Sequence, residues 1–238
     1  MTAHPDDLIY AIGDVHGRSD LLADLHRQVR DHAAARPTGR RTLVHLGDFV
    51  DRGHDSKGVI ERVLAPDLPG FECFALLGNH DWMMREFLRN PLDAWPGWMM
   101  NGARATLQSY GVTAPRTALD LDGTLAARDD LAEALPPAHW TFLETLRPYL
   151  LTAGYLFVHA GIRPGIPADR QAIDDLIWIR EEFLDSAADH GVVVVHGHTI
   201  APTPEIRQNR IGIDTGAYYS GHLTAVVLGR GTAAFLST

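Results

Sequence analysis

The chain has 238 residues, of which 45% are hydrophobic and 21% are charged, and its formal net charge is −9. This composition is ordinary for a globular protein with a substantial core. The negative charge and the lack of a Lys/Arg stripe argue against a nucleic-acid surface. No apolar run reaches the roughly 20 residues that a membrane helix needs.

The single cysteine, Cys73, has no partner for an internal disulfide. Its neighbours form a strand-like apolar run, so we expect a small buried side chain rather than a reactive thiol. Residues 1–7 lack the basic start and the apolar stretch of a signal peptide. We therefore expect a cytoplasmic protein, a compartment in which cysteines stay reduced.

Three apolar runs alternate with amphipathic segments in the first part of the chain. The runs 8–12, 43–46 and 73–77 predict strands, and the segments between them predict helices. Because strand–helix–strand alternation is typical of parallel sheets, we expect parallel strands joined by helical crossovers.

The helices have recognisable ends. Ser19 is the expected N-cap of the first helix, which residues 36–39 end, and Asp55 is the expected N-cap of the second. A third helix runs from Asp81 to about Arg89. The apolar residues expected on the inner faces are Leu21, Leu22, Leu25 and Val29 in the first helix and Val59, Ile60, Val63 and Leu64 in the second.

Residues 91–150 break this rhythm and predict a small helical cap. Aromatic residues such as Trp95, Trp98 and Trp140 are frequent here. They either only pack the insertion onto the body or also line a substrate groove. We treat residues 1–238 as a single domain that contains this insertion, because the polar motifs described below run from residue 13 to residue 199.

Short segments complete the chain. Residues 168–184 are expected to be largely helical, and the valine run 192–195 predicts a strand. The tail segments 210–214, 222–228 and 233–236 are separated by glycines, which predicts antiparallel strands that close a second sheet. The expected fold class is therefore α/β, a two-sheet sandwich flanked by helices.

Five short polar motifs each follow one of the apolar runs directly. They place Asp, His and Asn at the carboxyl ends of predicted strands, where open α/β sheets hold their ligands. Convergent carboxylate, amide and imidazole donors are typical of a two-metal hydrolase centre. The motifs are 13–17 (GDVHG), 47–53 (GDFVDRG), 78–81 (GNHD), 159–161 (HAG) and 196–199 (HGHT).

Six side chains in these motifs are candidate metal ligands. Asp48 can give one carboxylate oxygen to each of two cations, and Asn79 adds an amide oxygen without charge. The mixture of donors suits manganese, iron or zinc better than calcium or magnesium, and the lack of Cys ligands argues against structural zinc. The six residues are Asp14, His16, Asp48, Asn79, His159 and His198.

The motifs GDxHG, GDxVDRG and GNHD, in this order and spacing, resemble the phosphoprotein phosphatase family of metallophosphoesterases, in particular its bacterial and phage-type branch. The resemblance covers residues 8 to about 228. It implies the calcineurin-like architecture and two divalent ions per chain, with manganese expected, and a hydroxide between the ions that attacks phosphorus. By position, the first metal would be held by Asp14, His16 and Asp48, and the second by Asp48, Asn79, His159 and His198.

The resemblance assigns further motif residues to catalysis. Arg52 would bind phosphate oxygens together with Asn79, and Arg180 matches the later phosphate-binding arginine. Arg163, nearer to the HAG motif, competes with Arg180 for that role and would otherwise form a loop salt bridge. The general acid would be His80, whose charged imidazole is favoured and oriented by Asp51.

Four more residues near the motifs have less specific expectations. His196 is expected to hydrogen-bond a metal ligand or the substrate, and His45, within the second strand, is expected to be structural. For Tyr218 and Tyr219, contact with the substrate and simple packing both stay open.

We therefore predict a serine/threonine protein phosphatase that also accepts phosphotyrosine or small aryl phosphates. A symmetrical dinucleoside tetraphosphate hydrolase is the alternative within the same chemistry, and the acidic residue Asp51 argues against it. An inactive metal-binding scaffold is the alternative from another class. The expected partner is a phosphoprotein or small phosphoester substrate, with no nucleic acid and no membrane, and the expected state is a monomer.

Overall fold

The computed structural model describes residues 7–36, 39–229 and 231–238, and within these residues the strands form two five-stranded sheets. The strands are β1 (Leu8–Ile12), β2 (Arg41–His45), β3 (Phe71–Ala75), β4 (Tyr149–Thr152), β5 (Tyr155–Val158), β6 (Val193–His196), β7 (Glu205–Ile206), β8 (Arg210–Gly212), β9 (Thr224–Gly229) and β10 (Thr232–Ser237). The first sheet has the order β10-β9-β1-β2-β3, and the second has the order β4-β5-β6-β8-β7.

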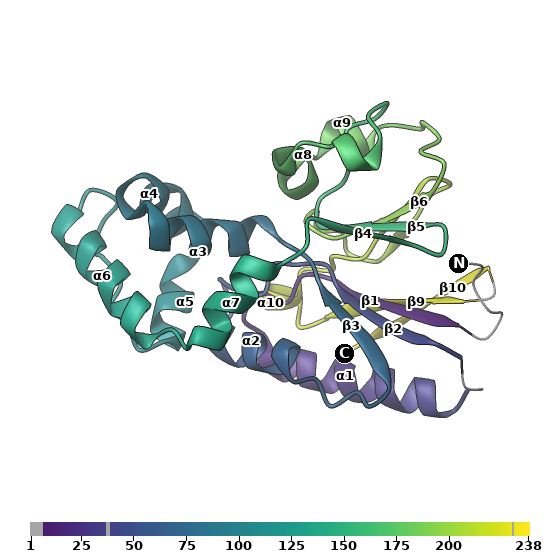
Figure 1. The fold of residues 1–238 in the computed structure, drawn as a ribbon, viewed down its shortest axis with the longest axis horizontal. Helices are drawn as coiled ribbons and strands as arrows, with labels where there is room; N and C mark the ends of the chain where they lie inside the picture. Colours follow the sequence, from purple (N-terminus) through teal and green to yellow (C-terminus); the bar gives the residue numbers. More distant parts are fainter. Residues whose placement is uncertain (1–6, 37–38, 230) are drawn as a thin grey trace.

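Helices flank the sheets, as the predicted fold class requires. They are α1 (Ser19–Ala34), α2 (Ser56–Leu64), α3 (Asn79–Arg89), α4 (Pro91–Met100), α5 (Ala103–Ser109), α6 (Leu121–Ala134), α7 (Pro137–Thr145), the 3-10 helix η1 (Ala168–Arg170), α8 (Ile173–Trp178), α9 (Glu181–Leu184) and α10 (Ala217–Ser220). In Figure 1, α1 and α2 lie along the first sheet, α8 and α9 lie near the second, and α3 to α7 extend to one side. Within the described residues, none of these helices has the length and apolar character to cross a membrane.

Residues 91–145, which contain α4 to α7, are called the helical insertion below. The last residues of the predicted cap, 149–150, belong instead to β4 of the second sheet. The insertion shares the apolar core under the helices of the body, and the rings of Trp95 and Trp98 pack against Phe87 of α3.

The topology explains why chain segments far apart can meet. β1, β2 and β3 are parallel, with α1 and α2 as the crossovers that the alternating pattern predicts. β5 and β6 are parallel in the second sheet. The carboxyl ends of parallel neighbours lie on the same edge, so the loops that follow them are side by side.

β1 is buried on both faces. Ile9 and Ala11 belong to the apolar layer between the sheets, together with Phe157 from the second sheet. Tyr10 and Ile12 point the other way, into the larger core under the helices. A strand buried on both sides needs apolar residues at every position, which is why this segment is a continuous apolar run.

The expectation that the tail closes the second sheet is wrong for two of its three segments. β9 and β10 join the first sheet, where β9 runs antiparallel to β1. β8 does belong to the second sheet, but it is parallel to β6. A local apolar pattern identifies a strand and carries no information about the strand with which it pairs.

Several helix expectations also need correction. Ser19 is the first helical residue of α1 rather than its N-cap, and Leu64, at the end of α2, is 43% exposed. The segment 168–184 is largely helical, as expected, but its helical residues are divided among η1, α8 and α9. Asp55 does cap α2, since its side chain accepts from the Gly58 N–H. The expectations for residues 1–6 and 37–38 lie outside the described residues.

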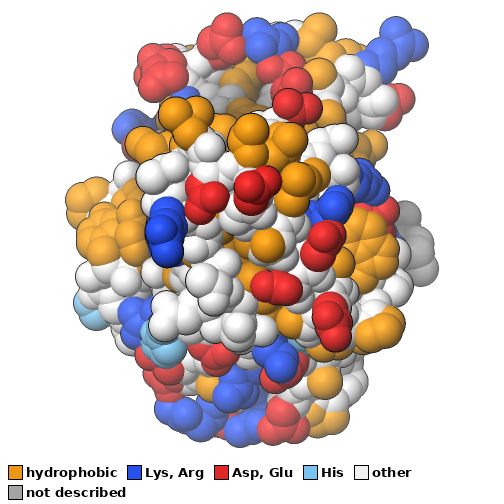
Figure 2. All heavy atoms as spheres, turned by 90° about the vertical axis from the view of Figure 1, so that its left-hand side faces the viewer, with side chains coloured by type: hydrophobic (Ala, Val, Ile, Leu, Met, Phe, Trp, Pro, Cys, Tyr) orange, Lys and Arg blue, Asp and Glu red, His pale blue; other side chains and the backbone are white. Residues whose placement is uncertain are grey.

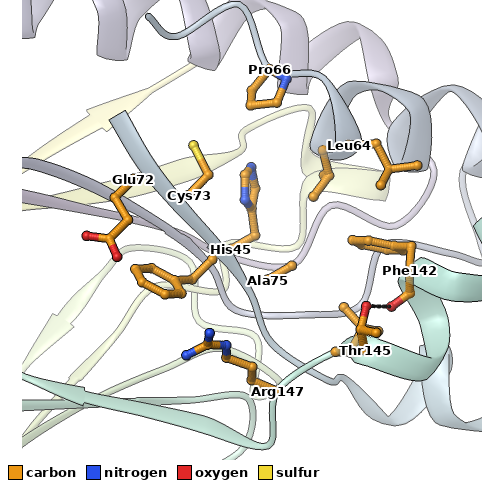
Figure 3. Close-up of a pocket in the computed structure, with 12 residues that line it drawn as sticks. His45, Leu64, Pro66, Glu72, Cys73, Ala75, Phe142, Thr145 and Arg147 are labelled. Carbon is orange, nitrogen blue, oxygen red and sulfur yellow. Dashed lines mark hydrogen bonds between the residues drawn. The ribbon is translucent and has the colours of Figure 1, made fainter. Parts of the chain in front are cut away.

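Cys73 is exposed, so the expectation of a buried thiol is wrong. β3 is the edge strand of the first sheet, and Cys73 borders a groove of about 430 Å³ that Leu64, Phe142 and Arg147 also line (Figure 3). An edge strand can carry an apolar sequence and still have one side open to solvent. Partial burial raises the pKa of the Cys73 thiol, which argues against a reactive thiolate.

Candidate metal centre and active site

The polar motifs meet at the edge where the strands of both sheets end. Asp14 and His16 follow β1, Asp48 follows β2, and His159 and His198 follow β5 and β6. These side chains are between 0% and 6% exposed. The structure therefore brings together donors that are more than a hundred residues apart in sequence.

The backbone of these loops adopts conformations that are rare outside functional sites. His16, Asp48 and His198 have φ angles of 45°, 52° and 63°, which side-chain-bearing residues seldom adopt. Gly78 approaches Asp48 so closely that a Cβ atom at this position would lie 2.1 Å from Asp48 Oδ1. The glycine of the GNHD motif is therefore required by close packing against a candidate ligand.

Asp48 is shared between two groups of donors. Its Oδ2 lies 3.5 Å from His16 Nε2, and its Oδ1 lies 3.5 Å from His159 Nε2. His80 completes the first group and His198 completes the second. One carboxylate with an oxygen toward each group has the geometry of a bridging ligand between two cations.

Backbone carbonyls orient two of the histidines. His16 Nδ1 donates to the Val50 carbonyl oxygen at 2.9 Å, and His159 Nδ1 donates to that of Leu46 at 3.0 Å. Because a carbonyl oxygen only accepts, each Nδ1 carries the proton and each Nε2 presents a lone pair to the site. Burial lowers the pKa of His16 to about 3, which keeps the imidazole in the neutral form that binds metal.

The second group brings acceptors face to face. His159 Nε2 lies 2.9 Å from Asn79 Oδ1 and 3.2 Å from His198 Nδ1. Both His159 Nε2 and the amide oxygen are acceptors, so they repel unless a positive charge lies between them. Burial lowers the pKa of His159, so at neutral pH an added proton on its ring does not supply that charge. These donors fit a divalent cation better than they fit one another.

Asp14 lies beside these groups and adds to their negative charge. Its carboxylate accepts from the His198 backbone N–H at 3.0 Å. Burial, and then the charges of Asp214 and Asp48, raise the pKa of Asp14 well above its usual range. Bound cations would relieve this crowding of buried carboxylates. Asp214 therefore contributes to the negative charge of the site.

A second constellation is built around His80. Its Nδ1 lies 2.7 Å from Asp51 Oδ2, and its Nε2 lies 3.1 Å from Arg52 Nη2. Burial opposes the charged imidazole, but the carboxylates of Asp48 and Asp51 outweigh it and raise the pKa of His80 above its ordinary value. Because a guanidinium nitrogen only donates, Nε2 is the acceptor in this contact, and His80 can give a proton from Nε2 only after Arg52 turns toward a phosphate.

The two competing arginines lie in different surroundings. Arg180 Nη1 donates to the His198 carbonyl oxygen at 3.2 Å and to Thr199 Oγ1 at 3.0 Å, so it borders the donor groups. Arg163 instead pairs with Asp175 at 2.6 Å and with Glu182 at 3.0 Å. This geometry favours Arg180 for phosphate contact and shows Arg163 in the loop salt bridge that was its alternative.

Asp81 is a buried residue whose role the sequence analysis missed. Its carboxylate accepts from the backbone N–H groups of Asp48 at 2.8 Å, Phe49 at 2.9 Å and Gly78 at 3.1 Å. It therefore ties the loop after β2 to the start of α3. Its bond to the Gly78 N–H is one half of a capping box, and glycine has no side chain to supply the other half.

The remaining candidates lie at the margin of the site. His196 Nδ1 donates to the Gly197 carbonyl oxygen at 3.1 Å, not to a candidate ligand side chain. The Tyr218 ring lies 5.5 Å from the His16 ring and 4.7 Å from the Arg52 guanidinium carbon. Tyr219 is 63% exposed. Of the two tyrosines, Tyr218 therefore contacts candidate site residues.

A family model described as calcineurin-like phosphoesterase matches residues 8–225 of the chain. A comparison with curated proteins finds no significant match.

Solved structures with the same fold come from several phosphatases. One, provisionally named a diadenosine tetraphosphatase, has a TM-score of 0.65 and 24% identity, over 99% of this chain and 96% of that one. A cold-active protein-tyrosine phosphatase of a psychrophilic Shewanella species has a TM-score of 0.56 and 18% identity, over 99% and 83%. A protein serine/threonine phosphatase from Saccharomyces cerevisiae has a TM-score of 0.55 and 15% identity, over 98% and 80%. At these identities the likeness shows the shared fold.

Proposed function

The chain belongs to the calcineurin-like phosphoesterase family, and from this premise we propose that it removes phosphate from phosphoserine and phosphothreonine in proteins. Phosphotyrosine and small aryl phosphates are further proposed substrates. The observation that carries the proposal is the His80–Asp51 pair, 2.7 Å apart, beside two donor groups that share Asp48.

The donor set suits divalent metal, and we propose manganese, with iron and zinc as the alternatives. Asp14, His16 and Asp48 would hold one ion, and Asp48 would hold the other together with Asn79, His159 and His198. When bound, the ions make water nucleophilic and neutralise charge on the phosphate oxygens.

The protein's own residues supply the other steps. We propose that Arg52 and Arg180 bind phosphate oxygens, because a guanidinium presents paired donors that match them. His80 donates its Nε2 proton to the ester oxygen as the phosphorus–oxygen bond breaks. Since Nδ1 stays bonded to Asp51, the ring keeps its orientation during the transfer.

The acid also bears on the choice of substrate. A serine alkoxide is an unstable leaving group and needs a proton, whereas a nucleoside diphosphate leaves as a stable anion and needs little help. The His80–Asp51 pair therefore supports a phosphomonoester with a poor leaving group. A symmetrical dinucleoside tetraphosphate hydrolase is the second candidate, because a protein of the same fold carries a provisional name of that kind.

We further propose that the protein acts as a monomer in the cytoplasm and binds neither nucleic acid nor membrane. In support, acidic and basic side chains are interspersed on the face shown in Figure 2, and no broad Lys/Arg patch covers it. A polyanionic partner would need such a patch.

The test is a substrate panel with the purified chain. Bound metal is measured first, and turnover is then compared for a phosphoserine peptide, a phosphotyrosine peptide, p-nitrophenyl phosphate and diadenosine tetraphosphate. The proposal expects the phosphopeptides to have a higher kcat/KM than the dinucleotide. The reverse order would support the second candidate, and a metal-loaded chain that is inert toward every ester would support the inactive scaffold.

A further inference from the structure

The buried carboxylate of Asp51 accepts more hydrogen bonds than its pairing with His80 requires. Its Oδ2 accepts from His80 Nδ1 at 2.7 Å and from Trp98 Nε1 at 2.8 Å. Its Oδ1 accepts from Thr106 Oγ1 at 2.6 Å. Asp51 is 0% exposed, so bulk water does not replace these donors.

The donors come from two different parts of the chain. His80 opens α3 beside the donor groups, whereas Trp98 lies on α4 and Thr106 lies on α5, both in the helical insertion. The same Thr106 hydroxyl also accepts from the Asp51 backbone N–H at 2.8 Å. The insertion therefore holds both the side chain and the backbone of Asp51.

The backbone at this point does not hold the carboxylate by itself. Asp51 and Arg52 have φ angles of 73° and 67°, a strained conformation that persists only where neighbouring groups enforce it. The Arg52 N–H donates to the carbonyl of Gly102, again in the insertion. The loop that carries the partner of the general acid is thus fixed from outside the sheet.

We propose that Trp98 and Thr106 are positioning residues that orient His80 through Asp51, so that the helical insertion takes part in proton transfer to the leaving group. This inference rests on the proposed function, because it needs an ester whose departure depends on His80. The insertion then has a role in the reaction that is separate from any role in substrate choice.

The main test replaces Trp98 by phenylalanine, which keeps an aromatic ring next to Phe87 and removes the indole donor. Because Asp51 would lose one of its fixed partners, kcat on a phosphoserine peptide should fall by about 10-fold to 100-fold, a part of what a general acid supplies. Turnover of p-nitrophenyl phosphate should change by no more than about 3-fold, since its leaving group needs little protonation. Bound metal per chain should stay unchanged.

Trp95→Phe is the matched control. Trp95 lies on the same helix, is also 0% exposed, and donates its indole N–H to the Thr117 carbonyl oxygen rather than to Asp51. The control loses the same atoms and one hydrogen bond, and it should leave the ratio of the two substrates at the wild-type value.

A second pair of variants keeps the inference testable if Trp98→Phe folds poorly. Thr106→Val removes the hydroxyl at nearly constant volume, whereas Thr106→Ser retains it. The valine variant should show the same selective loss on the phosphoserine peptide, and the serine variant should recover most of it. In an Asp51→Asn background, Trp98→Phe should have no further selective effect, because its influence passes through Asp51.

Two results would overturn the inference while the proposed function stands. One is an equal loss on both substrates in Trp98→Phe and Thr106→Val, and the other is a selective loss in Trp95→Phe as well. A wild-type chain that is loaded with metal and turns over no phosphomonoester would instead overturn the proposed function, and this inference with it.

Discussion

Two pairs of buried histidines in this protein, His16 with His159 and His26 with His45, differ in the atoms that their ring nitrogens contact. His16 and His159 gather around Asp48 at the edge where the strands end. His26 of α1 and His45 of β2 meet between the helix and the first sheet, with their Nε2 atoms 3.0 Å apart. All four side chains are at most 6% exposed, so burial does not distinguish the groups.

The difference lies in what the second nitrogen contacts. In His16 and His159 a carbonyl oxygen fixes the proton on Nδ1, and the free Nε2 faces a carboxylate. Neither His26 nor His45 belongs to a group of possible metal donors in the part of the chain that the structure describes. A buried histidine is thus a candidate ligand when its tautomer is fixed and a negative group lies opposite.

The largest effect is expected for Asp48→Asn, which removes the negative charge that His16 and His159 both face. Both cation sites should weaken, and phosphoester turnover should fall by about 10³-fold or more, since charge stabilisation at the phosphate is lost. Metal analysis and steady-state kinetics measure both effects. His26→Gln, which alters only the His26–His45 pair, is the control and should keep full metal content. Full metal content in Asp48→Asn would contradict the bridging assignment.

His80→Ala should have the next largest effect. His80 belongs to the first donor group, but the carboxylates of Asp48 and Asp51 raise its pKa, and a protonated ring cannot bind metal, so we expect it to act as an acid rather than as a ligand. Turnover of a phosphoserine peptide should fall by about 10²-fold to 10³-fold, with both metals retained. Undiminished activity on that peptide would refute the acid role, and loss of metal would place His80 among the ligands.

Asp81→Asn should have an intermediate effect. Its carboxylate accepts three backbone N–H groups, and an amide offers one acceptor oxygen and an NH₂ group that clashes with donors. Metal affinity should fall by about 10-fold to 100-fold, as for other residues that orient a ligand. A titration of activity with metal should show turnover recovering at high concentration. An unchanged titration curve would mean that the loop after β2 holds its shape without Asp81.

The smallest effect on activity is expected for substitution of His26, whose contribution should appear in the stability of the fold instead. Burial lowers the pKa of His26 from 6.5 to about 4. As the pH falls below about 6.5, the unfolded chain takes up this proton before the folded chain does. The contribution of neutral His26 to the free energy of unfolding is therefore fully present above that pH. It is lost on acidification toward pH 4, by up to about 1.4 kcal/mol per pH unit.

Urea unfolding between pH 4 and pH 7 measures this dependence. In metal-free buffer, His26→Gln should show a shallower loss of stability than the wild type and should keep normal phosphoester turnover when metal is restored. Equal slopes for the two proteins would show that His26 is not kept neutral by burial.

The parallel strands, their helical crossovers and the meeting of Asp14 and Asp48 could be predicted, because parallel neighbours place their carboxyl ends on one edge of a sheet. His159 follows β5 of the second sheet, so its approach to them depends on how the two sheets pack. The sheet to which β9 and β10 belong could not, since pairing depends on contacts with a strand more than two hundred residues earlier. Cys73 was misjudged for a similar reason: an apolar run does not reveal that its strand lies at an edge.

The amino-acid sequence alone establishes which residue types follow each strand and that Asp14 and Asp48, which follow parallel neighbours, lie close together. Only the tertiary structure decided what surrounds Asp51, because Trp98 and Thr106 lie 47 and 55 residues away along the chain. Local periodicity is set by the geometry of one helix or strand, whereas a buried carboxylate takes its partners from whatever elements the packing brings within hydrogen-bond distance.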